Sequence, residues 1–256
     1  EMLSGIKMQC LVDLKTPEDP RCRRSAVALL CCIGAHPMTN AAVMPAVILQ
    51  LCSAYEEGSE VPNHRRLTFL HVLLEAVISV RVLTGYMQTH PPKSGDASNP
   101  LVPFVDRIFI VSCDAIVNAT HLGGEGNEGG EAPGMELLCE MLMQGLLDEE
   151  RSKQAAAHIA NLLCYNKNPS GRACEVARKL AVSDMEGDGK TLELVLSSIV
   201  PQMVAAVQQE GGESLYGQVA TLCAASATVM REVLPSLTSL LSSGREGVIS
   251  CLQQMA

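Results

Sequence analysis

The apolar residues of this chain recur every three to four positions over almost its whole length. This spacing places them on one face of an α-helix, whereas a half-buried strand would show strict alternation, which is absent here. We therefore expect an all-α protein with about twelve helices of ordinary globular length. The expected helices span residues 2–15, 21–35, 41–55, 63–84, 101–122, 135–147, 149–165, 172–183, 192–209, 214–227, 228–242 and 245–255.

Composition agrees with packed helices. The 256 residues include no tryptophan, three phenylalanines and four tyrosines, although sheet proteins are rich in aromatic residues. Leu, Ala and Met are plentiful, and these residues lose little rotamer freedom in a helix. The length suits one large domain or a stretch of a repeat array.

Two polar segments interrupt the helical pattern. Residues 85–100 and the acidic, glycine-rich residues 123–134 are too polar to pack, and both are long for connections between helices. We expect two flexible loops, with a single helix over 101–122 between them. Helical repeats are expected on either side, over 1–84 and 135–256.

Prolines are expected near the start of several outer helices, where a missing N–H breaks no helical hydrogen bond. The residues concerned are Pro45, Pro103, Pro201 and Pro235. A proline placed deeper in one of these helices should kink it.

Charge limits the classes of ligand. The net charge of −9 argues against a nucleic-acid groove, which needs clustered Lys and Arg. The most apolar stretch, Leu67 to Leu83, is interrupted by His71, Glu75 and Arg81, so we expect no run of membrane-spanning length. No signal peptide is recognisable. The chain begins at Glu1, so we expect a fragment of a longer protein.

The eleven cysteines have neither C-x-x-C nor zinc-site spacing. Free cysteine in an apolar helix behaves as a small hydrophobic residue. We expect reduced core thiols in a cytoplasmic or nuclear protein. The cysteines in apolar helical stretches are Cys31, Cys32, Cys52, Cys139, Cys164, Cys223 and Cys251.

One segment is similar to the opening of a calcium loop. Asp184, Glu186 and Asp188 have the right spacing, but Val195 occupies the position where a bidentate carboxylate is needed. An acidic turn between helices explains the segment better. We expect no metal site there.

Catalytic signatures are not recognised either. His36 suits a helix C-terminus, His158 lies inside an apolar helix, and no histidine has a partner at metal spacing. There is no G-x-S-x-G elbow and no P-loop. We do not expect the protein to be an enzyme. We expect no catalytic or metal-binding residue, no cofactor and no small-molecule substrate. A small-ligand or metal-binding helical domain is the least favoured alternative.

Two joints resemble the turn inside a HEAT repeat, L-x-D-x-D-x-x-V-R-x-x-A-x-x-x-L. They are LKTPEDPRCRRSAVALLCCIG (14–34) and GLLDEERSKQAAAHIANLL (145–163). Acidic residues would sit at the N-terminus of the second helix, where the helix dipole favours negative charge. We expect one continuous α-solenoid of about six HEAT- or armadillo-like hairpins, with a compact helical bundle as the rival.

Three segments resemble a particular HEAT family, the methyl-methanesulfonate-sensitivity scaffold of the cytosolic iron–sulfur assembly targeting complex. They are SKQAAAHIANLLCYNKNPSGRACEVA (152–177), TLCAASATVMREVLPSLTSLL (221–241) and, more loosely, LLCCIGAHPMTNAAVMPAVILQLCSAY (29–55). The resemblance implies a cytosolic and nuclear scaffold that docks cluster-targeting factors and presents recipient apoproteins, including DNA-replication and repair enzymes. It does not imply that the scaffold ligates a cluster.

The functional hypothesis is therefore a protein-binding scaffold that contacts neither nucleic acid nor membrane. A HEAT-repeat transport or trafficking adaptor of the importin-like kind is the alternative. Arginine is enriched at binding hot spots, so arginines on apolar helices are the candidate contacts. These are Arg65, Arg66, Arg107, Arg172, Arg178 and Arg231.

Overall fold

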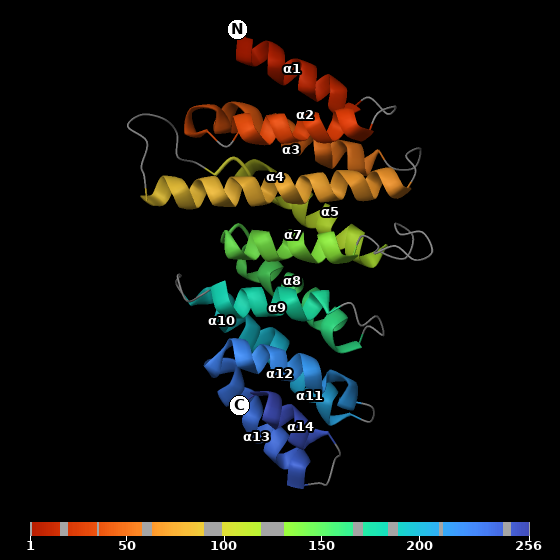
Figure 1. Ribbon diagram of the computed structural model, residues 1–256, viewed down its shortest axis with the longest axis vertical. Coiled ribbons are helices and arrows are strands. Elements are labelled where there is room, and N and C mark those ends of the chain that lie inside the picture. Colours follow the sequence, from red (N-terminus) through yellow and green to blue (C-terminus); the bar gives the residue numbers. More distant parts are fainter. Residues whose placement is uncertain are drawn as a thin grey trace. The chain divides into compact units, whose positions relative to one another are not determined.

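A computed structural model describes residues 2–15, 20–34, 36–57, 63–89, 99–118, 131–165, 171–183, 189–209, 212–242 and 247–255 (Figure 1). These residues form helices joined by turns and contain no strand, so the all-α prediction is confirmed for them. The chain divides into two compact units, Glu1–Leu146 (unit 1) and Leu147–Ala256 (unit 2). Whether a single array continues through both units stays a prediction.

Unit 1 is built from two layers of helices. Its elements are α1 (Met2–Lys15), α2 (Pro20–Gly34), α3 (Pro37–Glu56), α4 (Asn63–Thr89), the 3₁₀ turn η1 (Val102–Phe104), α5 (Val105–Val117) and α7 (Glu131–Met143). The main contacts join each helix to the following one or to the one after it. Helices α1, α3 and α5 thereby form one layer, and α2, α4 and α7 form the other, stacked in this order (Figure 1).

Unit 2 has the same kind of layering. Its elements are α8 (Glu149–Tyr165), α9 (Arg172–Ser183), α10 (Lys190–Leu194), the π-helical turn η3 (Val195–Ile199), α11 (Val200–Gln208), the 3₁₀ turn η4 (Gly212–Leu215), α12 (Tyr216–Ala225), α13 (Ala227–Ser242) and α14 (Val248–Met255). Helix α8 contacts α9 and α11, and α11 contacts α13, while α9 contacts α12, and α12 contacts α14. The layers are α8, α11, α13 and α9, α12, α14.

The predicted loop boundaries need correction. Residues 85–89 are the last turn of α4, and residues 131–134 are the first turn of α7. A single exposed glycine such as Gly85 costs a helix only about 1 kcal/mol and does not end it. Pro133 lies in the first turn of α7, where proline is tolerated. Residues 90–98 and 123–130 of the two predicted loops lie outside the described residues, as do residues 119–122 at the end of the helix predicted over 101–122.

Local capping explains the turn at 144–148. Gly145 has φ 63° and ends α7 in a Schellman motif, with N–H groups of Gly145 and Leu146 donating to carbonyls of Leu142 and Met141. Asp148 then caps α8, because its carboxylate accepts the Arg151 N–H at 2.8 Å. The predicted acidic start of this helix is confirmed. The acidic residues of the 14–34 joint lie outside the described residues.

The four prolines all fall in one layer of their unit. Pro103 lies in η1, but Pro45 and Pro235 lie beyond the first turn of α3 and α13, so their predicted position was wrong. Pro201 follows the π-helical turn in the continuous helix α10–η3–α11. Because proline has no N–H, the carbonyl one turn earlier in the helix loses its hydrogen bond. Distortions of the helix are expected at such points.

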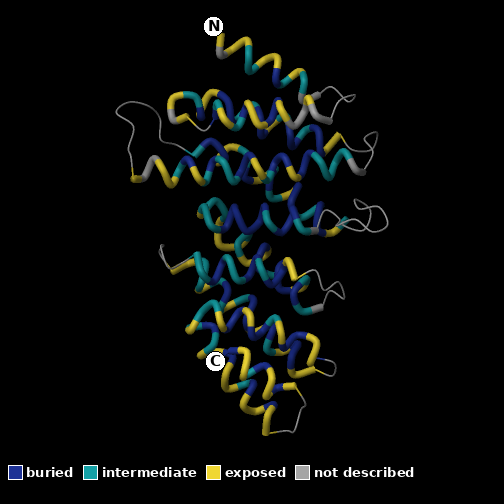
Figure 2. The backbone as a smooth tube through the Cα atoms, viewed as in Figure 1, coloured by how far each residue is buried: buried dark blue, intermediate teal, exposed yellow. Residues whose placement is uncertain are grey.

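The described helices bury many of their apolar residues, while others, such as Met8, Val82 and Ile110, are exposed. Buried and exposed stretches alternate along the helices of both units (Figure 2). The core of unit 1 is aliphatic and includes Leu30, Met44, Ile48, Leu70 and Leu73 among its fully buried side chains.

Three helical spans are long and apolar enough to cross a membrane, judged by length and composition alone. They are Met38–Glu56, Arg65–Tyr86 and Lys190–Gln208. The expectation that no run reaches this length was therefore wrong. The charges that interrupt the middle span, Glu75 and Arg81, do not offset its many Leu and Val residues. Less than half of each span is buried inside the fold.

Candidate functional site

Arg66 belongs to a polar cluster that joins three helices of unit 1. Its guanidinium lies 4.4 Å from the ring centroid of Tyr55 and donates from Nη2 to Asp114 Oδ2 at 3.1 Å. The Tyr55 hydroxyl donates to the same oxygen at 2.8 Å, and Asn118 Nδ2 donates to the other at 2.8 Å. Burial and the hydrogen bond to Asp114 raise the pKa of Tyr55. The cluster therefore links α3, α4 and α5 through side-chain hydrogen bonds.

Arg107 is held in a similar way. From α5 it donates to Glu56 Oε1 at 3.1 Å and to Ser53 Oγ at 3.2 Å, both on α3, and it pairs with the second Glu56 oxygen. The hydrogen bond to Glu56 raises the pKa of Arg107. Arg65 is half-buried on α4. Arg66 and Arg107 thus form ion pairs between helices inside unit 1.

The three candidate arginines of unit 2 are divided between its layers. Arg172 and Arg178 lie on α9, and Arg231 is exposed on α13. Arg178 forms a two-pronged pair with Glu175, with nitrogen–oxygen distances of 2.8 and 2.7 Å. The structure therefore brings Arg172 and Arg178 to one helix and leaves Arg231 in the other layer.

Sequence reasoning missed a buried ion pair. Glu140 of α7, with a side chain only 5% exposed, accepts from Arg81 Nε of α4 at 2.5 Å and from Arg81 Nη2 at 3.4 Å. The two residues are 59 positions apart. The available signal was that Arg81 and Glu140 each interrupt a largely apolar segment.

Most of the cysteines fill the interior. None of the eleven, all within the described residues, forms a disulfide, and Cys10, Cys52, Cys139, Cys174, Cys223 and Cys251 are buried. Burial raises the pKa of Cys52 and of Cys223 to about 12, and that of Cys31, Cys164 and Cys174 to about 11. Packing therefore explains most thiols, as predicted, but Cys32 is exposed.

Iodoacetamide at about pH 8 should alkylate Cys22 and Cys32 first, because the thiolate is the reacting form and both are exposed. A thiol with a pKa near 12, as at Cys52 and Cys223, holds only about one thiolate in ten thousand at that pH. Peptide mass spectrometry over time measures the order of labelling. In urea all four should react at similar rates. Equal rates in the native chain would contradict the packing.

The segments weighed as metal or catalytic candidates have these positions in the structure. Among the described residues no three His, Cys, Asp or Glu side chains come together at metal-binding distance. Asp184, Glu186 and Asp188 lie outside them. His36 was predicted to end a helix, and this prediction was wrong. It caps the start of α3, where its Nδ1 accepts the Met38 N–H at 3.2 Å.

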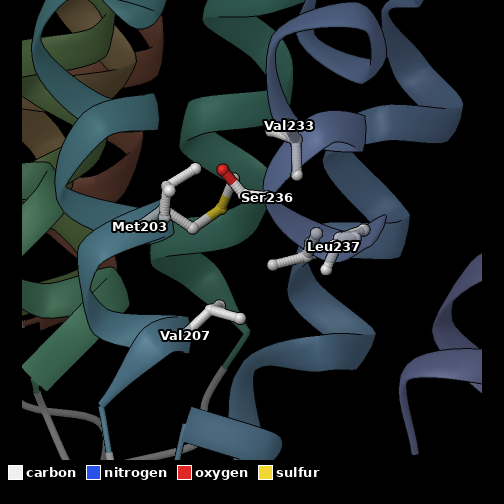
Figure 3. A pocket seen from close by; sticks show the side chains of 7 residues that line it. Met203, Val207, Val233, Ser236 and Leu237 are labelled. Carbon is white, nitrogen blue, oxygen red and sulfur yellow. The ribbon is translucent and has the colours of Figure 1, made fainter. Parts of the chain in front are cut away.

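A small apolar pocket lies in unit 2 between α11, α12 and α13. The cavity volume is about 10 Å³, which leaves room for about one water molecule. Met203 and Val207 of α11 face Val233 and Leu237 of α13 across it (Figure 3). Ser236 supplies the one hydroxyl in its lining. The pocket is best explained as a packing gap.

The chain matches no protein-family model, no curated protein and no solved structure. Its function is therefore inferred from its own side chains and helix contacts. Ion pairs of Arg66, Arg81 and Arg107 join helices of unit 1, six thiols are buried, and the basic residues of α9 lie toward solvent.

Proposed function

We propose that the chain is an α-solenoid of HEAT-type hairpins and works as a non-catalytic scaffold that binds other proteins. The supporting observation is the contact pattern inside each unit, where the main contacts join neighbouring helices and second neighbours. A closed bundle would also bring its first and last helices together. Here the main contacts join neither α1 to α7 nor α8 to α14. Stacked repeats are expected to behave in this way.

Proline placement supports the HEAT type. Kinked helices are common in HEAT arrays, and here the prolines fall in α3, η1, α11 and α13, within one layer of each unit. The helix that follows the 145–148 joint begins with a capped acidic turn and then buries Ala155 and Ala156. Both features match the repeat pattern that the sequence resembles.

A solenoid presents long helical faces, and its partners recognise shape and charge on them. The family resemblance suggests that the partners are iron–sulfur targeting factors and their client apoproteins in the cytoplasm and nucleus, including DNA-repair enzymes. In this proposal the partners, and not this chain, carry the cluster. The buried thiols support that division of roles, because their ordinary work is packing.

A truncation tests the architecture. Ending the chain at Ser226 removes α13 and α14, and in a repeat array hydrogen-exchange protection of α8 and α9 should persist. As a matched control, Leu180→Pro in α9 should remove protection from α8 and α12, which pack against it. Loss of protection throughout unit 2 after truncation would support a closed bundle instead.

Affinity purification with quantitative mass spectrometry tests the role, with an unrelated HEAT protein as the control bait. Recovery of iron–sulfur assembly factors, followed by direct binding of the purified components, would support the proposal. Recovery of a nuclear-transport GTPase and its cargo would favour the importin-like alternative. Stoichiometric metal in the purified chain would overturn the assignment of the thiols as packing residues.

A further inference from the structure

We propose that the solvent-facing side of α9 is a docking site for an acidic segment of a partner protein, with Arg172, Arg178 and Lys179 receiving its carboxylates. This inference rests on the proposed scaffold function and adds the chemistry of the partner. It also selects among the candidate arginines, because Arg66 and Arg107 already hold unit 1 together.

The two sides of α9 differ sharply. One side is small and buried, and it consists of Ala173, Cys174, Val176, Ala177, Leu180 and Ala181. The other side carries Arg172, Glu175, Arg178 and Lys179, all exposed or half-exposed. Residues three and four apart lie on one face of a helix, so these four side chains form a single stripe.

The stripe is basic although the chain is acidic. Three basic side chains and one carboxylate share it, whereas the whole chain has a net charge of −9. The hydrogen bond from Arg178 lowers the pKa of Glu175, and the charges of Arg178, Lys179 and Arg172 lower it further. A carboxylate placed on this stripe is therefore stabilised in its charged form.

The Arg178–Glu175 pair leaves room for a second carboxylate. Its side chains are 40% and 38% exposed, and a guanidinium has five N–H donors, of which Glu175 does not use all. Exposed pairs of this kind contribute little to stability, so an incoming carboxylate can share or replace Glu175. Arginine suits this exchange because its planar fork binds carboxylates in two-pronged geometry.

The neighbouring helix α12 exposes small, uncharged side chains. Helix α12 packs against α9, where Cys174 Sγ lies 3.6 Å from the Gln218 carbonyl oxygen. The exposed residues of α12 include Gly217, Thr221 and Ala224, which are small and uncharged. No atom lies within 4 Å of where a Cβ on Gly217 would be. Helix α12 therefore adds no charged side chain that would compete with α9 for a carboxylate.

An acidic peptide fits this stripe better than a nucleic acid does. Binding to a phosphate backbone needs many basic residues along a groove, and α9 offers three beside one carboxylate. A short row of carboxylates matches that number.

Fluorescence anisotropy of the full chain with a labelled twelve-residue Glu-rich peptide tests the proposal. The peptide with Gln in place of Glu is the control ligand. Binding should require the Glu residues and should weaken when salt rises from about 50 to about 200 mM. Combined Arg172→Gln, Arg178→Gln and Lys179→Gln should weaken it about tenfold, because the steering and receiving charges are lost.

A matched variant removes the same charge elsewhere in unit 2, with Arg151→Gln, Lys153→Gln and Arg231→Gln. It should change affinity less than about twofold if the α9 stripe is the site. Glu175→Gln should strengthen binding, since it removes the competing carboxylate, and a merely structural role of α9 would not produce that gain. Melting curves of each variant confirm that it is folded.

Equal losses in the two triple variants would overturn the proposal, because they would show attraction to charge alone. Tighter binding of duplex DNA or of anionic vesicles through the same three residues would overturn it as well. If the acidic peptide fails to bind but assembly factors are still captured, the docking site is wrong and the scaffold proposal stands. Failure of both would remove the scaffold proposal too.

Discussion

Replacing Arg81 with methionine should lower the free energy of unfolding of unit 1 by about 2–4 kcal/mol. Methionine keeps most of the aliphatic stem, but it removes the guanidinium that lies 2.5 Å from the buried Glu140 carboxylate. An ionised carboxylate without a partner in the core is costly. Arg81 is itself 42% exposed, and water reaching the pair keeps the loss below the largest values known for buried pairs. Urea unfolding, with hydrogen exchange read at α4 and α7, measures the loss.

A double replacement separates the ion pair from simple packing. Arg81→Met combined with Glu140→Leu should recover most of the lost free energy, because an apolar pair of similar volume often replaces a buried ion pair without loss. Arg231→Met on the exposed side of α13 is the control and should change stability by less than about 0.5 kcal/mol. If the double variant were no more stable than Arg81→Met, the unpaired carboxylate would not be the cause.

Gly134→Ala should destabilise unit 1 by about 1–3 kcal/mol, although alanine is the better helix former. A Cβ at this position would lie 2.8 Å from the Ser112 carbonyl oxygen, 3.0 Å from Ile116 and 3.2 Å from Ala115. The first of these atoms is backbone and cannot rotate away. Helices α5 and α7 share the most extensive contact between described helices, so they would have to separate. Thermal unfolding and exchange rates in α5 and α7 measure the effect.

Gly85→Ala provides the opposite case within the same unit. Gly85 lies inside α4, it is exposed, and nothing lies within 4 Å of its would-be Cβ. Alanine there should stabilise the helix by about 0.5–1 kcal/mol, because it removes backbone freedom from the unfolded chain. Stabilisation by both replacements would show that α5 and α7 do not approach closely at Gly134.

Local signals were enough to predict several helices residue by residue. Helices α1, α8 and α9 begin and end at the predicted residues. For α8, the reason lies within a few neighbouring residues: Asp148 caps the helix, Glu149 and Glu150 follow in its first turn, and small apolar residues repeat along one side. The errors at α4 and α7 have a local cause as well. Gly85 and the Pro133–Gly134 pair were interpreted as loop signals, although one glycine is tolerated in a helix and proline is tolerated at its start.

The candidate arginines show where local signals stop. Arg66, Arg107 and Arg178 look alike in sequence, each being a basic residue within a largely apolar helical segment. Only the folded structure shows that Arg66 pairs with Asp114 and Arg107 with Glu56, both on other helices. Arg178 is half-exposed and pairs with Glu175 on its own helix.

The sequence by itself determined that the chain forms helices, where several of them begin and end, and that most of its cysteines act as core residues. These properties depend on residues within one or two turns of each other. The tertiary structure alone decided which charges meet, as with Arg81 and Glu140 across 59 positions, and why Gly134 must have no side chain. Such contacts depend on how two helices cross, and that is set by the packing of many distant side chains at once.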